Sequence, residues 1–211
     1  MLPSYELLIA FFSAAILFAY MPGPAMLYTA AQTIARGRHS GWLAALGIHI
    51  GGYAHVVAAA LGLAALFQAI PTLYALVKLL GAGYLIWLGI RLLLSQERLT
   101  TSVADIDMAS TRRPFWESII VEVLNPKTAL FFLAFLPQFI DTAGALPIWA
   151  QLLLLGTIVN LIFSSADILC VLLADKVARV LKSSRAAGNL TRRLGGGLLV
   201  TLGINLAVSR Q

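Results

Sequence analysis

The sequence predicts an all-α integral membrane protein with six transmembrane helices, arranged as two inverted three-helix repeats in which helices 1 and 4 are broken. Three observations predict this class. The 211-residue chain is 60% hydrophobic and only 11% charged, with a mean hydropathy of +0.88, whereas a soluble domain carries about 25% charged residues. The apolar residues form six long runs, and the basic residues collect in alternate loops between them. So few charges cannot cover a water-facing surface, and most of the surface is expected to face lipid.

The six apolar runs have the length of membrane spans. They cover roughly residues 5–35, 41–67, 71–94, 115–140, 146–174 and 194–209. A bilayer core needs about 20 helical residues, and only the sixth run is shorter than this; residues 186–193 can extend it as an interfacial turn. The first run lacks a preceding basic segment and exceeds the ~7–15 apolar residues of a signal peptide. We therefore expect it to be retained as a span.

The basic residues predict the orientation of these spans. Two, four and six of them lie in the loops associated with the ends of the first, third and fifth runs, and the loops after the second and fourth runs contain none. Because Lys and Arg accumulate in cytoplasmic loops, the first set of loops is expected to be cytoplasmic and both termini periplasmic. Membrane topology thus accounts for the net charge of +6, and no nucleic-acid partner is expected.

A polar stretch divides this single transmembrane domain, residues 1–211, into two halves. Residues 95–115 form the expected cytoplasmic loop between halves 1–94 and 116–211. The segments LGAGYLIWLGIRL and LGGGLLVTLGINL, at 80–92 and 194–206, share eight of thirteen residues; chance similarity between two Gly- and Leu-rich spans is the alternative. Because each half has an odd number of spans, the second half would enter the membrane from the opposite side. This is the inverted repeat found in many secondary transporters.

Helix breakers stand near the middle of the first and fourth runs. The first break is Pro22-Gly23-Pro24, within FAYMPGPAMLYTA, and the second is Asn125-Pro126-Lys127. Proline removes a backbone donor and clashes with the preceding turn, and in lipid the freed polar groups must face protein or a water-lined cavity. Half-helix N-termini can hold an anion and half-helix C-termini a cation. We therefore expect the two breaks to bind a zwitterion such as a free amino acid, with kinks that only improve packing as the alternative.

Four further residues are candidates for a site around the breaks. Lys127 is expected to have a partner, because a buried cation costs at least ~2.5 kcal/mol, and Glu122 and Asp167 are the candidates. Asp167 is interpreted either as a carboxylate that couples transport to protons or binds an amine, or as a structural residue that forms an ion pair or a hydrogen bond to Ser164. Glu122 can equally lie at the membrane interface. His55 and Asn160 are candidates for pocket lining, with helix packing as their alternative.

Other chemistries find little support in the sequence. Cys170 is the only cysteine, so neither an internal disulfide nor a paired-thiol site is possible. His49 and His55 are separated by about 600° of helical rotation, so they form no metal pair, and no metal site is expected. Asp167 is the only deep aspartate, whereas an intramembrane aspartyl protease needs two. Ser164 and His55 lack a GxSxG-type elbow, and no enzymatic activity is expected.

Three stretches of the chain resemble the LysE/RhtB family of amino-acid exporters. They are PGP at 22–24, GAGYLIWLGIRLL at 81–93 and, most specific, LNPKTALFFLAFLPQF at 124–139. The resemblance implies a secondary transporter that exports amino acids such as homoserine, threonine, leucine or lysine, driven by the proton-motive force. It also implies a multi-pass protein of the bacterial inner membrane.

By position, the resemblance assigns the motif residues to substrate binding: Pro22, Gly23, Pro24, Asn125, Pro126 and Lys127. One departure concerns the start of the fourth run, where the family often has a basic residue and a glycine after phenylalanine. Here Phe115 is followed by Trp116, Glu117 and Ser118, which puts the choice of substrate in doubt but not the class.

The implied partners are an amino-acid substrate, protons and membrane lipid, with no cofactor. A homodimer is left open. Two alternatives remain: a metal-ion exporter of related architecture, and a membrane scaffold protein that transports nothing. A metal exporter would want clustered His, Cys or carboxylate ligands, and measured flux would distinguish a scaffold from a transporter.

Overall fold

The computed structural model describes residues 5–65 and 113–173, together with ten isolated helical residues at 79, 83, 86, 87, 90, 94, 197, 200, 201 and 204. The predicted runs 71–94 and 194–209 therefore lie almost wholly outside the described residues. The similarity of segments 80–92 and 194–206 predicts that Gly81 and Gly195, and likewise Gly89 and Gly203, occupy equivalent positions in the two halves. These four glycines also lie outside the described residues.

All regular structure in the described residues is helical, as the sequence predicts. The elements are α1 (Tyr5–Ala19), α2 (Pro24–Arg36), α3 (Arg38–Ala58) with a π-helical continuation (Ala59–Leu63), α6 (Pro114–Val123), α7 (Pro126–Phe135) with a 3₁₀ turn (Leu136–Phe139), and α8 (Ile148–Leu172). Within the described residues, two helices are long and apolar enough to cross a membrane, Arg38–Leu63 and Ile148–Leu172. The number of candidate membrane spans there rises to as many as four if each of two bent helix pairs counts as one span.

The bent pairs are the two runs that contain the predicted breaks. Leu7–Ala19 and Pro24–Arg36 meet at 46°, and Pro114–Val123 and Pro126–Phe139 meet at 45°. In both pairs the proline is the first residue of the second helix, where its missing N–H lies among the groups that have no partner within a helix. The prediction that these spans are interrupted next to Pro24 and Pro126 is confirmed.

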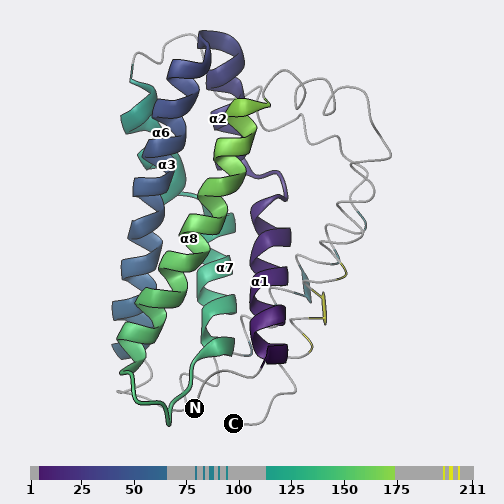
Figure 1. Cartoon of the computed structure of the whole chain (residues 1–211), viewed down its shortest axis with the longest axis vertical. Coiled ribbons are helices and arrows are strands. Elements are labelled where there is room, and N and C mark those ends of the chain that lie inside the picture. The colour runs from purple at the N-terminus through teal and green to yellow at the C-terminus, as the bar shows by residue number, and fades with distance from the viewer. Residues whose placement is uncertain are drawn as a thin grey trace.

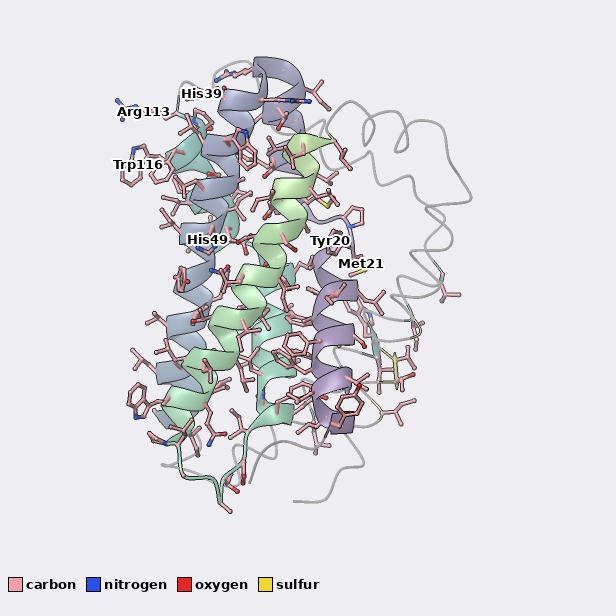
Figure 2. All side chains as sticks on the ribbon, viewed as in Figure 1. Tyr20, Met21, His39, His49, Arg113 and Trp116 are labelled. Carbon is pink, nitrogen blue, oxygen red and sulfur yellow. The ribbon has the colours of Figure 1, made fainter. Side chains whose placement is uncertain are left out.

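The six helices form one bundle in which the broken spans lie beside the long ones (Figure 1). α3 and α8 run along its length, α2 and α6 occupy one half, and α1 and α7 occupy the other. Figure 2 shows His39, Arg113 and Trp116 at the α2–α6 end, whereas Tyr20, Met21 and His49 lie at mid-height. Gly37, with a φ of +84°, reverses the chain between α2 and α3, a conformation that glycine adopts without steric cost.

Glycines allow α3 to lie directly against α6. A Cβ atom on Gly47 would collide with Ser118 Oγ and the Phe115 carbonyl, and one on Gly51 would lie 2.9 Å from Glu122 Cβ. Small residues spaced by four bring helix backbones together in this way in membranes. This contact fixes the first half of the fourth run against α3, and with it the position of the second break.

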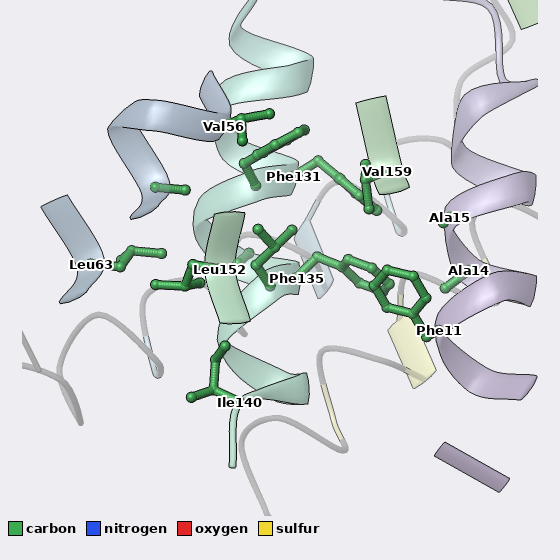
Figure 3. Close-up of a cluster of buried hydrophobic side chains, with 14 of the residues drawn as sticks. Phe11, Ala14, Ala15, Val56, Leu63, Phe131, Phe135, Ile140, Leu152 and Val159 are labelled. Carbon is green, nitrogen blue, oxygen red and sulfur yellow. The ribbon is translucent and has the colours of Figure 1, made fainter. Parts of the chain in front are cut away.

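Stacked phenylalanines pack α1 against α7. Phe18 stacks on Phe131 with ring centroids 4.1 Å apart, and Phe11 stacks on Phe135 at 5.5 Å. Phe11 also meets Phe139 edge-to-face at 5.0 Å. Figure 3 shows Phe11 reaching from α1 toward Phe135, beside α8. We call these five rings the phenylalanine stack; they fill the α1–α7 half of the bundle with apolar atoms.

Candidate functional site

The two breaks face a shared cavity of about 30 Å³ at the middle of the bundle. Its wall includes Gly23 and Met26 from the first broken span, Asn125 and Lys127 from the second, and Asp167 from α8. A water molecule needs roughly 10–15 Å³ measured in this way. The cavity can therefore hold a water molecule or two but no amino acid. In this structure it is closed to a molecule of that size.

Lys127 of the second break binds the backbone of the first. Its Nζ donates hydrogen bonds to the carbonyls of Phe18 at 3.1 Å and Met21 at 2.5 Å, and it lies 4.6 Å from the centroid of the Phe18 ring. Carbonyls at a helix C-terminus carry partial negative charge, so the end of α1 is a favourable place for an ammonium group. The sequence had favoured Glu122 or Asp167 as the partner of this cation; the carbonyls that the break exposes accept its hydrogen bonds, and both carboxylates lie with Lys127 in the wall of the same cavity.

Gly23 is the residue that the Lys127 side chain crosses. A Cβ atom at position 23 would lie 2.7 Å from Lys127 Cδ and 3.2 Å from Nζ. The backbone of Gly23 is extended, with a φ of −143°, so its conformation alone does not require glycine. The close approach of Lys127 requires it, and the two sequence motifs therefore meet as parts of one contact.

Asn125 organises the second break. Its Oδ1 accepts a hydrogen bond from the Lys127 backbone N–H at 3.1 Å, which caps α7, and its Nδ2 donates to Glu122 Oε2 at 2.9 Å. Glu122 is only 3% exposed and lines the cavity. Glu122 is therefore buried inside the bundle, where α6 packs against α3 along the two turns that separate it from Pro114.

The three prolines shape the breaks without lining the cavity. Pro24 and Pro126 are exposed on the outside of the bundle, and Pro22 is half-buried. Of the six predicted substrate-binding residues, the structure thus brings three to the cavity wall: Gly23, Asn125 and Lys127. The prolines act through the backbone, by ending α1 and α6 and starting α2 and α7 beside the cavity.

Asp167 is a buried carboxylate in the cavity wall, 5% exposed. Within residues 5–65 and 113–173 it forms no hydrogen bond. The expected partner, Ser164, instead donates to the Asn160 carbonyl at 2.8 Å and lies 2.6 Å from His49 Nδ1. The expected hydrogen bond between Asp167 and Ser164 was therefore wrong, whereas an ion pair of Asp167 stays a prediction.

Asn160 both joins two helices and lines the cavity. Its Nδ2 donates to the His49 carbonyl at 3.1 Å, across from α8 to α3, and a Cβ atom on Gly52 would collide with its Oδ1. His49, whose ring approaches Ser164, was missed by the sequence interpretation. That interpretation had favoured His55, which lies outside the cavity wall and donates from Nε2 to the Glu122 carbonyl at 2.7 Å.

The charges around the cavity do not balance when all are ionised. Among the described residues of its wall, two carboxylates, on Glu122 and Asp167, face one ammonium group, on Lys127. In a medium of low dielectric constant such an excess attracts one further positive charge, which can be a proton or an amine. The described residues contain no group of three or more His, Cys, Asp or Glu placed to hold a metal ion.

Comparison with known proteins gives consistent matches along the chain. The family model of the LysE type translocators matches residues 16–210. An uncharacterised membrane protein of Pseudomonas aeruginosa is 33% identical over 196 residues, covering 90% of this chain and 89% of that protein. A leucine efflux protein of Enterobacter sp. is 32% identical over 193 residues, covering 92% and 91%. An uncharacterised membrane protein of Vibrio cholerae is 27% identical over 204 residues, covering 96% and 97%. No solved structure matches.

Proposed function

This chain belongs to the LysE type translocator family, and we propose that it is a secondary transporter that exports a neutral amino acid across the bacterial inner membrane in exchange for protons. The family is one of translocators rather than enzymes. The relatives named as leucine efflux proteins favour a substrate with an apolar side chain. The apolar part of the cavity wall, which includes Ile48 and Phe163, supports the same choice.

The unpartnered Asp167 carboxylate is the observation that carries this proposal. A carboxylate held inside a membrane without a hydrogen bond is costly, and its cost is removed when a proton or an ammonium group arrives. Because one more positive charge would balance the carboxylates of the cavity, a proton and the ammonium group of the substrate compete for binding at Asp167. Competition of this kind makes the substrate leave when the proton binds, which is the basis of an exchange.

The first turn of α2 offers a place for the other end of the substrate. Pro24 has no N–H, and the first bond within the helix runs from the Leu27 amide to the Gly23 carbonyl. The amides of Ala25 and Met26 precede it, no side chain caps the helix, and both residues line the cavity. A helix N-terminus favours an anion. A zwitterion can thus place its carboxylate at α2 and its ammonium at Asp167, once the cavity widens.

We further propose that the two halves of the chain form the inverted repeat. Its support is the correspondence between the broken spans, which bend by 46° and 45° at matching prolines. In this arrangement the loops bearing most of the basic residues face the cytoplasm and both termini face the periplasm. The end of the bundle where α2 ends at Arg36 and α3 begins at Arg38, and where Figure 2 shows Arg113, is then the cytoplasmic end.

Efflux from loaded cells tests the function. Cells that lack their own exporters are loaded with each amino acid of a panel, and efflux is followed with and without an uncoupler. We expect the chain to accelerate the efflux of neutral, apolar amino acids, to lose this effect with the uncoupler, and to lose it in Asp167→Asn. If the chain accelerates the efflux of no amino acid in the panel, the result would contradict amino-acid export and favour the alternative of a membrane scaffold protein that transports nothing. Efflux that ignores the uncoupler would contradict proton exchange alone.

A further inference from the structure

Polar side chains on α2 lie buried without hydrogen-bond partners. Thr29 and Gln32 are both 0% exposed, and among the described residues Thr29 Oγ1, Gln32 Oε1 and Gln32 Nε2 form no hydrogen bond of good geometry; the Gln32 amide lies beside the Tyr28 hydroxyl without forming one. Thr33, on the same helix, differs because its hydroxyl donates to the Thr29 carbonyl at 2.7 Å. Buried polar groups without partners destabilise the state that contains them, and native structures contain few of them. They therefore need an explanation.

Their place in the bundle is between the cavity and the end that carries the arginines. α2 begins at the cavity with Ala25 and Met26 and ends at Arg36. Thr29 and Gln32 are three residues apart, so they share one face of the helix. That face is covered in this structure, since α2 packs against α3, α8 and α6. The wall of the central cavity includes neither residue.

The two ends of the bundle are closed in different ways. Beyond the cavity on the α2–α6 side, the Tyr28 hydroxyl donates to Glu117 Oε2 across the two helices at 3.3 Å. On the other side, the phenylalanine stack joins α1 to α7. One closure thus includes a hydrogen bond between polar side chains beside unsatisfied polar groups, and the other is apolar packing of aromatic rings. The first is the easier to open, because water can satisfy every group that it exposes.

We infer that the face of α2 carrying Thr29 and Gln32 lines the path by which the amino acid reaches the cavity from the cytoplasm, closed in this structure by the Tyr28–Glu117 hydrogen bond. The inference rests on the proposed direction of export. When α2 and α6 separate, water and the charged ends of the substrate bind the hydroxyl and the amide. When they close again, the unsatisfied groups favour reopening toward the same side. The path therefore binds its substrate through groups that are polar but uncharged, which hold a zwitterion weakly and release it onward.

Thiol labelling tests the path without knowledge of the substrate. In a Cys170→Ala background, we expect Gln32→Cys to react with a membrane-impermeant thiol reagent in inside-out vesicles and to be protected in right-side-out vesicles. Ala14→Cys on α1 is the matched control, since Ala14 is equally 0% exposed but belongs to the apolar core that contains the phenylalanine stack; it should stay unlabelled in inside-out vesicles. Thr29→Cys repeats the test if the first variant fails to fold.

Near-isosteric apolar substitutions test the role of the polar atoms. Gln32→Leu and Thr29→Val should raise the melting temperature and slow export roughly tenfold, because they remove groups that only the open path satisfies. Thr29→Ser keeps the hydroxyl and should restore most of the export that Thr29→Val loses. A higher melting temperature with unchanged export would overturn the inference, and so would a lower melting temperature, which would reveal a partner for these groups.

The outcomes separate this inference from the proposed function. Labelling of Gln32→Cys from the cytoplasmic side without export of any amino acid leaves the path standing and refutes the proposed substrate. Export by a Gln32→Cys variant that is labelled in neither orientation overturns the path and leaves the proposed function standing.

Discussion

Adding a methyl group at Gly23 is expected to break the contact between the two sequence motifs. In Gly23→Ala the new Cβ would lie 2.7 Å from Lys127 Cδ and 3.2 Å from Nζ, so the lysine side chain must move. Its ammonium then loses the Phe18 and Met21 carbonyls. A hydrogen bond to a charged group contributes about 1.5–3 kcal/mol. Both hydrogen bonds are lost, but the flexible lysine side chain can move and recover part of that free energy. We therefore expect Gly23→Ala to lower the free energy of unfolding by about 3 kcal/mol.

A double-mutant cycle isolates this contact. Lys127→Met removes the ammonium but keeps a long side chain, which no hydrogen bond holds over position 23. We therefore expect Gly23→Ala to cost much less in the Lys127→Met background, with a coupling of roughly 1–3 kcal/mol. The assay is equilibrium unfolding in detergent micelles followed by circular dichroism. Gly62→Ala is the matched control, because nothing lies within 4 Å of a Cβ atom there, and it should leave stability unchanged or slightly raised. Equal costs of Gly23→Ala in the two backgrounds would refute the contact as the reason for the glycine.

Three further predictions concern coupling, topology and packing. Asp167→Asn should abolish export that depends on the proton gradient while the folded protein stays in the membrane. In the wild type, the export rate should fall as the periplasmic pH rises. If the variant keeps that pH dependence, Asp167 is not the residue that couples export to protons. A reporter fused after Ser102 should be cytoplasmic and one fused after Thr142 periplasmic, and a cytoplasmic signal at Thr142 would contradict both the topology and the inverted repeat. Gly52→Ala should lower the melting temperature, because its Cβ displaces the Asn160 amide, whereas an unchanged melting temperature would show that α3 and α8 can separate freely there.

Local chemistry explains why the breaks were predictable. Proline acts through its own ring and its missing N–H, so Pro24 and Pro126 mark helix starts in the sequence as clearly as in the structure. The spacing of Gly47 and Gly51 similarly indicated a packed face, and the structure places α6 against it. Such features depend on a few neighbouring residues and need no knowledge of the rest of the fold.

The partners of the buried polar groups depend on tertiary structure and were largely missed. The carbonyls that bind Lys127 belong to every residue type, so nothing in the sequence distinguishes Phe18 and Met21. His49 and His55 both lie on α3, and hydrophobic periodicity does not indicate which one approaches Ser164. Thr29 and Gln32 resemble ordinary polar residues near a helix end until their burial is known.

The phenylalanine stack has an electrical consequence in the proposed orientation. Water and ions do not enter a column of contacting aromatic rings, so this half of the bundle insulates when the opposite half opens to the cytoplasmic solution, as proposed above. Most of the membrane potential therefore falls across the stack, and Asp167 senses a potential close to that of the cytoplasm. A proton that reaches Asp167 from outside gains almost the full drop, about 2.3 kcal/mol for each 100 mV. The rings that block leakage are thus the part of the molecule that converts membrane voltage into work on the substrate.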